Sequence, residues 1–500
     1  MVSAMRHEDV PIGHPERLFI DGEWVAPSSG SRFSVINPAS EEVYAVVAEA
    51  QAADIERAVA AARAAFDHGP WPRMSHRERA AYLSAAAGTL ARRAAEAGAI
   101  WASEVGIVNA TAQALVAGMP DALSYYAGLA ETFPFIEPRQ GQDPARKAFI
   151  VREPVGVAAL IVPWNSALAL LLYKASPALL AGCTLIVKMS PESPLDGYLM
   201  AEIMAEAGLP KGVFNVVTAD REVSELLVRH PDVDKVSFTG STAAGKKIAS
   251  ICGERIARCT LELGGKSAAV VLDDYDVGKV AEVIAGSTCL LTNQVCSALS
   301  RIVVSRNRHD EMVSALASAF GGIRLGDPFD PETQMGPLAM SRQRDRVESY
   351  IARGVSDGAQ LATGGRRPRD LNRGFFIEPT VFGDVPPDAV IAQEEIFGPV
   401  VTVIPADNEA QAVEIANGTP FGLNSAVFTN DLQRAYRVAR GLRAGTVGHN
   451  SFQTDFSVSF GGFKQSGIGR EGGTEGLLPY LETKTMILDA TPDFSQPLTG

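Results

Sequence analysis

The spacing of apolar residues predicts a chain of alternating strands and helices. Between residues 155 and 272, helix-length segments separate five short apolar runs, which are 156–162, 184–187, 213–216, 235–238 and 267–272. A second alternating block extends from about 300 to 447. Strands that alternate with helices at this spacing form mostly parallel sheets covered by helices on both faces. The pattern therefore predicts an α/β fold with two doubly wound sheets.

Three segments lie outside these blocks. Residues 53–105 are helical in pattern, because Ile55, Val59, Ala62 and Phe66 recur every three to four positions. Residues 133–152 and 483–490 are strand-like but have no obvious sheet of their own. Such strands form a local edge hairpin or add to the sheet edge of another chain.

Bulk composition excludes several classes of protein. The chain has 500 residues, 46% hydrophobic and 21% charged, which is ordinary for a globular protein and long enough for two or three domains. A net charge of −13 without a basic run argues against nucleic acid and anionic membranes as partners. No run of about 18 apolar residues predicts a transmembrane helix, and residues 1–9 show no secretory signal.

Cysteine and histidine usage adds two expectations. Five cysteines at irregular spacing suit a reducing compartment, so a cytoplasmic protein is predicted. None of the seven histidines pairs with cysteine at the spacing of metal ligands, and no metal site is expected.

Cys296 and Glu262 are the strongest chemical signals. Cys296 follows an apolar helix-like run and precedes a predicted strand, and Glu262 ends another strand before a glycine turn. A cysteine nucleophile and a carboxylate base are the groups needed to form and hydrolyse a thioester. An isolated cysteine is more often a small buried hydrophobe, so the neighbouring motifs decide between the two interpretations.

Polar residues also end other predicted strands. Asn165 follows 161–164, where ligands bind in open α/β sheets, and its amide suits an oxyanion, although a turn asparagine is the alternative. Lys188 ends the next strand and suits a ribose or phosphate. Residues 238–245, with Gly240 and Ser241, form a glycine turn before a helix, which is a weak phosphate-binding signal.

Together with the motifs at 393–399, 417–423 and 460–471, these residues resemble the aldehyde dehydrogenase superfamily from about Leu18 to Leu488. The resemblance implies three domains: a nucleotide-binding domain (1–132 and 153–261), a catalytic domain (262–476) and a small β extension (133–152 and 477–500). The extension implies a homo-oligomer, either a dimer or a dimer of dimers.

The same resemblance implies roles for individual residues. Cys296 matches the nucleophile, Glu262 the general base, and Asn165 an oxyanion donor that acts with the backbone N–H of Cys296. The matching cofactor positions are Lys188 at the adenosine ribose, Trp164 and Ser241 at the pyrophosphate, Glu395 and Phe397 at the nicotinamide half, with Gly240 and Gly264 in the same motifs.

Three positions depart from the family pattern. Asn293 stands where glycine is usual, and Leu291 where asparagine is frequent, and both belong to the loop beside the nucleophile. Pro191 replaces a glutamate that many NAD-preferring relatives carry, and Glu192 follows it. If Glu192 reaches the ribose, NAD is favoured over NADP; if it points away, both cofactors work. We expect NAD preference.

These residues imply oxidation of an aldehyde to a carboxylic acid through a thiohemiacetal and a thioester. Alternatives are a CoA-acylating semialdehyde dehydrogenase, whose members tend to lack the glutamate, a cysteine hydrolase using a base such as His309, and a catalytically silent protein on this fold. A hydrophobic substrate, aromatic or medium-chain, is expected from the predicted pocket residues Leu170, Tyr173, Phe452, Phe456 and Phe460.

Overall fold

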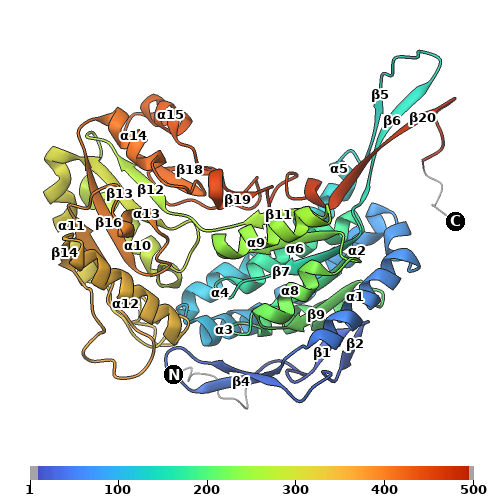
Figure 1. Ribbon diagram of the computed structural model, residues 1–500, viewed down its shortest axis with the longest axis horizontal. Coiled ribbons are helices and arrows are strands. Elements are labelled where there is room, and N and C mark those ends of the chain that lie inside the picture. The colour runs from blue at the N-terminus through green and yellow to red at the C-terminus, as the bar shows by residue number, and fades with distance from the viewer. Residues whose placement is uncertain (1–9, 495–500) are drawn as a thin grey trace.

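The computed structural model describes residues 10–494 and contains two large sheets and a projecting three-stranded arm (Figure 1). The expectation about a leader at 1–9 and the last residues of the predicted extension, 495–500, lie outside the described residues. Within 10–494, none of the helices combines the length and apolar character needed to cross a membrane.

The first sheet has eight strands in the order β19-β11-β10-β7-β8-β9-β1-β2. Its central strands β11, β10, β7, β8 and β9 are parallel, and β1, β2 and β19 add antiparallel edges. The strands are β1 (Leu18–Ile20), β2 (Glu23–Val25), β7 (Val157–Ile161), β8 (Thr184–Met189), β9 (Phe214–Thr218), β10 (Lys235–Thr239), β11 (Arg258–Glu262) and β19 (Gly467–Ile468).

Helices bury both faces of this sheet. In β7, Ala158 and Leu160 join one apolar core while Val157, Ala159 and Ile161 join the other, because successive side chains of a strand point to opposite faces. One face is covered by α2 (His76–Arg92), α3 (Ala94–Val105), α4 (Asn109–Ala117), α5 (Pro120–Thr132), α6 (Ala167–Ala181) and α7 (Leu195–Glu206). The other is covered by α1 (Ala52–Asp67), α8 (Arg221–Arg229) and α9 (Thr242–Glu254).

The second sheet has seven strands in the order β14-β15-β16-β13-β12-β17-β18, all parallel except β14. They are β12 (Ser267–Val271), β13 (Leu299–Ser305), β14 (Gln360–Thr363), β15 (Thr380–Gly383), β16 (Val400–Ala406), β17 (Asn424–Phe428) and β18 (Thr446–His449). Its helices are α10 (Val277–Cys289) and α11 (His309–Gly321) on one face, and α12 (Ser341–Ser356), α13 (Val390–Gln393), α14 (Glu409–Asn417) and α15 (Leu432–Gly441) on the other.

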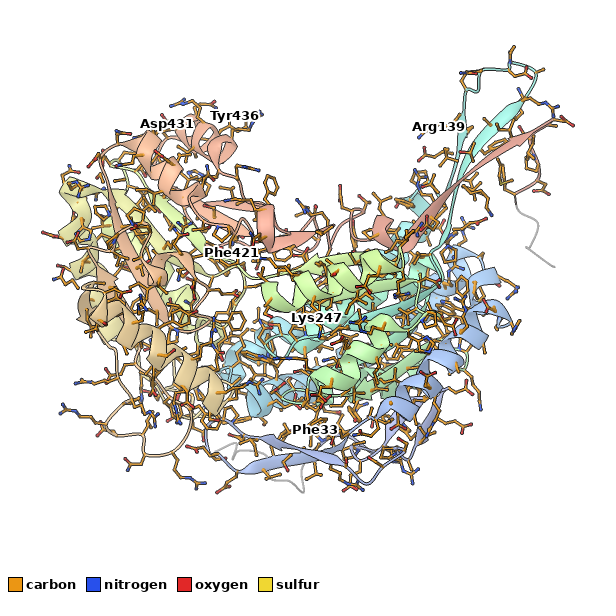
Figure 2. The ribbon with its side chains drawn as sticks, in the orientation of Figure 1. Phe33, Arg139, Lys247, Phe421, Asp431 and Tyr436 are labelled. Carbon is orange, nitrogen blue, oxygen red and sulfur yellow. The ribbon has the colours of Figure 1, made fainter. Side chains whose placement is uncertain are left out.

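The arm consists of β5 (Ile136–Arg139), β6 (Lys147–Pro154) and β20 (Leu481–Leu488), in the order β20-β6-β5. The two orphan segments thus pair with each other, and β20 and β5 form the outer edges of the arm's sheet. Figure 2 shows Arg139 on the arm, at the opposite end of the molecule from Asp431 and Tyr436 at α15. A separate hairpin, β3 (Arg32–Ile36) and β4 (Val43–Ala48), completes the strands near the N-terminus.

The structure confirms the predicted α/β class and corrects two details. Residues 53–105 form three helices, α1, α2 and α3, because the segment between α1 and α2 contains Gly69, Pro70 and Pro72, which interrupt a helix. The run 267–272, grouped by its spacing with the first block, is β12 of the second sheet. Strand periodicity does not tell which of two sheets a strand joins.

Candidate active site

The loop before Cys296 has an unusual backbone. Leu291, Thr292 and Asn293 are consecutive left-handed residues, with φ of 52°, 53° and 58°. Asparagine is among the side chains that tolerate this region best, whereas β-branched threonine is strained there. The Thr292 hydroxyl lies 3.0 Å from the carbonyl oxygens of both Gly336 and Pro337 and donates to this pair. The departure at Asn293 is therefore compatible with the loop, since the replaced glycine favours the same conformation.

Asn165 lies beside this loop. It follows β7 and precedes α6, and its Nδ2 donates a hydrogen bond of 3.0 Å to the carbonyl oxygen of Gln294, two residues before Cys296. The Trp101 indole N–H donates to the backbone oxygen of Asn165 at 2.8 Å, which fixes the turn. The side-chain amide is thus buried and held at the nucleophile loop.

Glu262 ends β11 as expected and is 2% exposed. Neither of its carboxylate oxygens has a hydrogen-bond partner among the described residues. Burial raises the pKa of Glu262 well above its usual range, and the nearby Glu471 raises it further. A raised pKa makes the Glu262 carboxylate a stronger base than an exposed glutamate.

Lys174 and Glu471 form a buried ion pair that sequence analysis missed. The Lys174 ammonium donates to Glu471, and the Ser237 hydroxyl donates to the same carboxylate oxygen at 3.3 Å. Lys174 also lowers the pKa of Glu262, against the larger effect of burial. The two residues are 297 positions apart, so no local sequence pattern connects them.

The Cys296 thiol is protonated in this arrangement. Burial raises its pKa to about 12, and the carboxylates of Glu395 and Glu262 act in the same direction. The backbone N–H groups of Ser297 and Cys296 oppose this shift. Nucleophilic attack therefore requires a base or a further positive charge at the thiol.

The predicted ribose residues Lys188 and Glu192 lie together at the carboxyl end of β8. The Lys188 ammonium makes no hydrogen bond to the described residues, and burial lowers its pKa to about 8 while Glu192 and Asp220 oppose the shift. Glu192 accepts from the Ser190 hydroxyl and from Nη2 of Arg342, the latter at 2.5 Å. Sequence analysis did not predict Arg342, because it lies on α12, a helix of the second sheet, 150 positions from Glu192.

Of the two predicted pyrophosphate residues, Trp164 lies between β7 and α6, and Ser241 lies at the N-terminus of α9. Ser241 is the N-cap of this helix, and its Oγ accepts from the Ala244 N–H. Gly240 precedes it, and the hydroxyls of Thr239 and Thr242 are buried without partners among the described residues. Free N–H groups and unpaired hydroxyls at a helix N-terminus suit a phosphate.

The predicted nicotinamide residues, Glu395 and Phe397, lie in the loop between α13 and β16. Glu395 accepts from the Gly265 N–H at 3.1 Å, and a Cβ at Gly264 would approach its Oε2 to 2.4 Å, so a side chain there would displace the Glu395 carboxylate. Burial raises the pKa of Glu395 to about 7. The rings of Trp164 and Phe397 meet edge to face with centroids 5.4 Å apart, joining the two sheets' loops.

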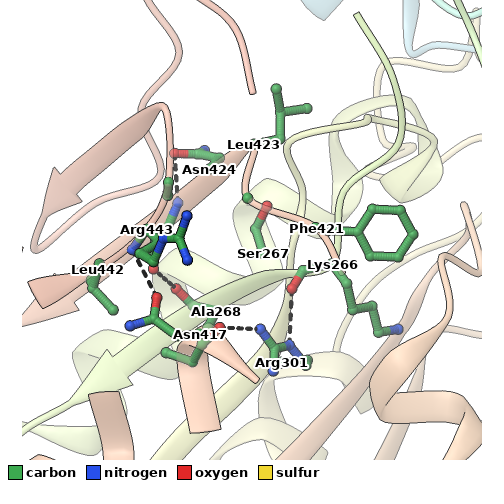
Figure 3. Close-up of a pocket in the computed structure, with 14 residues that line it drawn as sticks. Lys266, Ser267, Ala268, Arg301, Asn417, Phe421, Leu423, Asn424, Leu442 and Arg443 are labelled. Carbon is green, nitrogen blue, oxygen red and sulfur yellow. Dashed lines mark hydrogen bonds between the residues drawn. The ribbon is translucent and has the colours of Figure 1, made fainter. Parts of the chain in front are cut away.

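Lys266 is another buried cation that sequence analysis did not select. Its backbone oxygen accepts from Arg301, while its side chain extends away from that guanidinium (Figure 3). The ammonium has no hydrogen-bond partner among the described residues, and burial, with Arg301, lowers its pKa to about 7. Glu395 and Glu394 oppose the shift, which places Lys266 near the predicted nicotinamide side.

Three of the five predicted pocket residues form one aromatic cluster. The rings of Tyr173 and Phe456 are parallel with centroids 4.2 Å apart, and Phe456 and Phe460 are also 4.2 Å apart. Leu170 is buried one turn before Tyr173 on α6. Phe452 packs instead against the core between the second sheet and α10 and α11.

Two buried carboxylates connect the loops that carry Asn165 and Glu192. Glu104 accepts from the Ser193 hydroxyl at 2.8 Å and from the Leu195 N–H at 3.1 Å. Asp196 accepts from the Leu168 N–H at 3.1 Å. Burial raises the pKa of Asp196 to about 7 and that of Glu104 well above its usual range. Both carboxyl groups therefore keep their protons to a higher pH than exposed ones do.

His309 does not reach Cys296. It begins α11, after β13, whereas Cys296 precedes β13. Its Nε2 accepts from the Asp384 N–H at 2.9 Å. This position disfavours the cysteine hydrolase alternative, which needs a histidine within hydrogen-bond reach of the thiol.

Comparison with known proteins agrees with this geometry. Residues 24–486 match the model of the aldehyde dehydrogenase family. The chain is 41% identical over 475 residues to a geranial dehydrogenase of Castellaniella defragrans, covering 95% of this chain and 98% of that one. It is 39% identical to a betaine aldehyde dehydrogenase of Bacillus subtilis, over 95% and 98% of the two chains.

Solved structures give the same result. An aldehyde dehydrogenase of Mycobacterium tuberculosis in complex with NAD+ superposes with a TM-score of 0.92 at 43% identity, over 94% of this chain and 97% of that chain. A mutant aldehyde dehydrogenase of Pseudomonas syringae with NAD+ and octanal has a TM-score of 0.92 at 39% identity, over 97% and 99%. This chain belongs to the aldehyde dehydrogenase family.

Proposed function

We propose that the protein oxidises a hydrophobic aldehyde to its carboxylic acid with NAD, using Cys296 as nucleophile, Glu262 as base and Asn165 as oxyanion donor. The observation that carries this proposal is the convergence at one loop: Asn165 hydrogen-bonds to Gln294, and Glu262 raises the pKa of Cys296. Nucleophile, base and oxyanion donor are the groups that thioester chemistry requires.

The first half of the reaction is attack by Cys296 on the aldehyde carbon. Cys296 attacks as the thiolate after its proton has passed to solvent, and the Asn165 amide turns from Gln294 to the carbonyl oxygen, where the Cys296 N–H also donates. A preorganised donor of this kind is worth roughly 2.7–4 kcal/mol. Bound NAD supplies the hydride acceptor that turns the adduct into a thioester.

The cofactor assignment rests on unpaired groups in this chain. NAD+ is present in the structures of relatives from M. tuberculosis and P. syringae. Here the buried ammonium of Lys188 suits a ribose hydroxyl, and the N-terminus of α9, with the hydroxyls of Thr239 and Thr242 unpaired among the described residues, suits the pyrophosphate. Glu395 and Phe397 would hold the nicotinamide half against Gly264.

In the second half, Glu262 activates water against the thioester and the acid leaves. The carboxylate is buried against Gly461, where a Cβ would approach Oε1 to 2.7 Å, and Lys174 and Glu471 control its charge. The presence of this base distinguishes hydrolysis from acyl transfer to CoA.

The substrate proposal rests on the aromatic cluster of Tyr173, Phe456 and Phe460 together with Leu170. Burying an aliphatic or aromatic tail against them gains about 0.8 kcal/mol per methylene. The matches to a geranial dehydrogenase and to a structure with octanal support a hydrophobic tail. An anionic semialdehyde is disfavoured, because the carboxylates of Asp455 and Asp121 lie close enough to Tyr173 to raise its pKa and would repel a further negative charge.

A cationic aldehyde is the second candidate. Asp455 and Asp121 both raise the pKa of Tyr173, after the larger effect of burial, so two carboxylates lie near the aromatic cluster. Carboxylates beside aromatic faces suit an ammonium group. Relatives named betaine aldehyde dehydrogenase and aminoaldehyde dehydrogenase are 39% and 40% identical.

The test is kcat/KM with NAD, without CoA, for acetaldehyde to octanal, benzaldehyde, betaine aldehyde, 3-aminopropanal and succinic semialdehyde. We expect efficiency to rise with chain length until the pocket is full. A maximum at the two cationic aldehydes would favour the second candidate. NADH formation only after CoA is added would support the CoA-acylating alternative, and no NADH under either condition would support the catalytically silent one.

We also propose the division into a nucleotide-binding domain (1–132 and 153–261), a catalytic domain (262–476) and an oligomerisation extension (133–152 and 477–500) in a cytoplasmic protein. The outer edges of β20 and β5 are available to a second copy of the chain, and Ile487 on β20 is 63% exposed. Light scattering at micromolar concentration should give a dimer or tetramer; a monomer mass would contradict the role of the arm.

A further inference from the structure

An ion pair closes the ribose end of the proposed cofactor site. Arg342, the second residue of α12, places Nη2 2.5 Å from Oε1 of Glu192, and the other Glu192 oxygen accepts from Ser190. The Glu192 side chain is 21% exposed and that of Arg342 is 66% exposed. A group from the second sheet's helices thus reaches the carboxylate expected to read the ribose.

We propose that Arg342 is a specificity-determining residue that weakens the rejection of NADP by neutralising Glu192. The inference rests on the proposed function, which places the adenosine ribose at Lys188 and Glu192. A free carboxylate at this position accepts from the ribose hydroxyls of NAD and repels the 2′-phosphate of NADP. A carboxylate paired with a guanidinium accepts less strongly from the ribose hydroxyls and repels the 2′-phosphate less.

The charges around the ribose end support this direction. Lys188 faces two carboxylates, Glu192 and Asp220, and Arg342 supplies the second positive charge. Asp220 also caps α8 by accepting from the Val223 N–H at 2.9 Å. With Arg342 the four groups are balanced, and without it one net negative charge would face a 2′-phosphate.

Arg342 can also bind the phosphate directly. Its side chain is largely exposed, so the guanidinium can leave Glu192 when a 2′-phosphate enters. Guanidinium groups bind phosphate through two parallel hydrogen bonds, which a lysine at the same position does not reproduce. Removing Arg342 should therefore increase the preference for NAD.

The test uses fragments that undergo no reaction. Calorimetry would measure ADP-ribose and 2′-phospho-ADP-ribose binding to the full-length protein, to Arg342→Gln and to Arg342→Lys. We expect Arg342→Gln to weaken the phosphorylated fragment by roughly tenfold, with ADP-ribose affinity changed by less than about threefold. Arg342→Lys should restore part of the affinity, since it keeps the charge.

Arg353→Gln is the matched control, because Arg353 lies on the same helix and forms its ion pair with Asp357, one turn away. It should leave the ratio of the two affinities unchanged. An unchanged ratio in Arg342→Gln, with both fragments bound by the parent protein, would overturn the role of Arg342 alone. If the parent binds neither fragment, the proposed cofactor site fails and the inference fails with it.

Discussion

The two large sheets share one architecture but supply the site from opposite edges. In the first sheet, Asn165, Lys188 and Glu262 follow or end β7, β8 and β11, so they lie at carboxyl ends, where open α/β sheets usually bind ligands. In the second sheet, Cys296 precedes β13 and Gly264 precedes β12, at the opposite edge. The site lies where these two edges face each other.

The second sheet's own carboxyl edge is not part of this site. It contains a hollow of about 600 Å³ next to the ends of β12, β13 and β16. Its charged groups pair with one another: Arg306 with Asp407 at 2.8 Å and Arg434 with Glu409 at 2.6 Å. The comparison shows that strand direction locates the ribose and pyrophosphate groups, whereas the positions of the nucleophile and of the nicotinamide-side residues depend on how the two sheets pack together.

The sharpest test of this division removes the second sheet's contribution to the chemistry. Cys296→Ala should lower kcat by about a thousandfold or more, because no other group can form the thioester. ADP-ribose affinity should persist, since the proposed ribose and pyrophosphate groups belong mainly to the first sheet. Cys289→Ser, at the end of α10, is the control and should keep its activity. Turnover above a few per cent in Cys296→Ala would contradict the assignment.

The next test removes the base from the first sheet. Glu262→Gln should lower steady-state kcat by roughly a hundredfold, because water is no longer activated. If hydrolysis is the step affected, stopped-flow absorbance should show a burst of one NADH per site before the slow phase. Glu282→Gln, on the exposed face of α10, should behave like the parent. Unchanged steady-state turnover would remove Glu262 from the mechanism.

A smaller effect should distinguish the two environments in which the aromatic residues of the loop after β18 pack. Phe456→Ala should reduce kcat/KM for octanal relative to propanal by roughly tenfold, since the ring stacks between Tyr173 and Phe460. Phe452→Ala should instead lower the melting temperature with little change in chain-length dependence, because Phe452 packs on the second sheet's core. The reverse pattern would show that the substrate tail lies along Phe452.

The smallest effect concerns Asp196, one of the two buried carboxyl groups that connect the loops carrying Asn165 and Glu192. The folded pKa of Asp196, about 7, is above the unfolded value of about 3.9, so the folded protein binds more protons between these limits. Its contribution to the free energy of unfolding therefore falls as pH rises from about 4 to 7.

Asn at this position stays neutral at every pH. Asp196→Asn should raise the melting temperature relative to the parent by a few degrees more at pH 8 than at pH 5. Asp370→Asn, an exposed control, should show no such difference. Equal shifts of Asp196→Asn at both pH values would mean that Asp196 does not retain its proton in the folded protein.

The sequence by itself determined the α/β class, the strands that end in Lys188 and Glu262, and the family, because these depend on local periodicity and on motifs in a fixed order. The sequence also identified, as strand-like, the two segments that form the arm. It did not separate β12 from the first block or divide 53–105 into helices, since the apolar period alone does not identify a sheet partner or a break.

Only the tertiary structure decided which distant groups meet. Lys174 contacts Glu471 across 297 positions and Arg342 contacts Glu192 across 150, and neither pair leaves a local pattern in the sequence. The left-handed run at Leu291–Asn293 is held by contacts with remote backbone oxygens. Charge, burial and backbone strain at the site are properties of packed neighbours, so they exist only once the two sheets have come together.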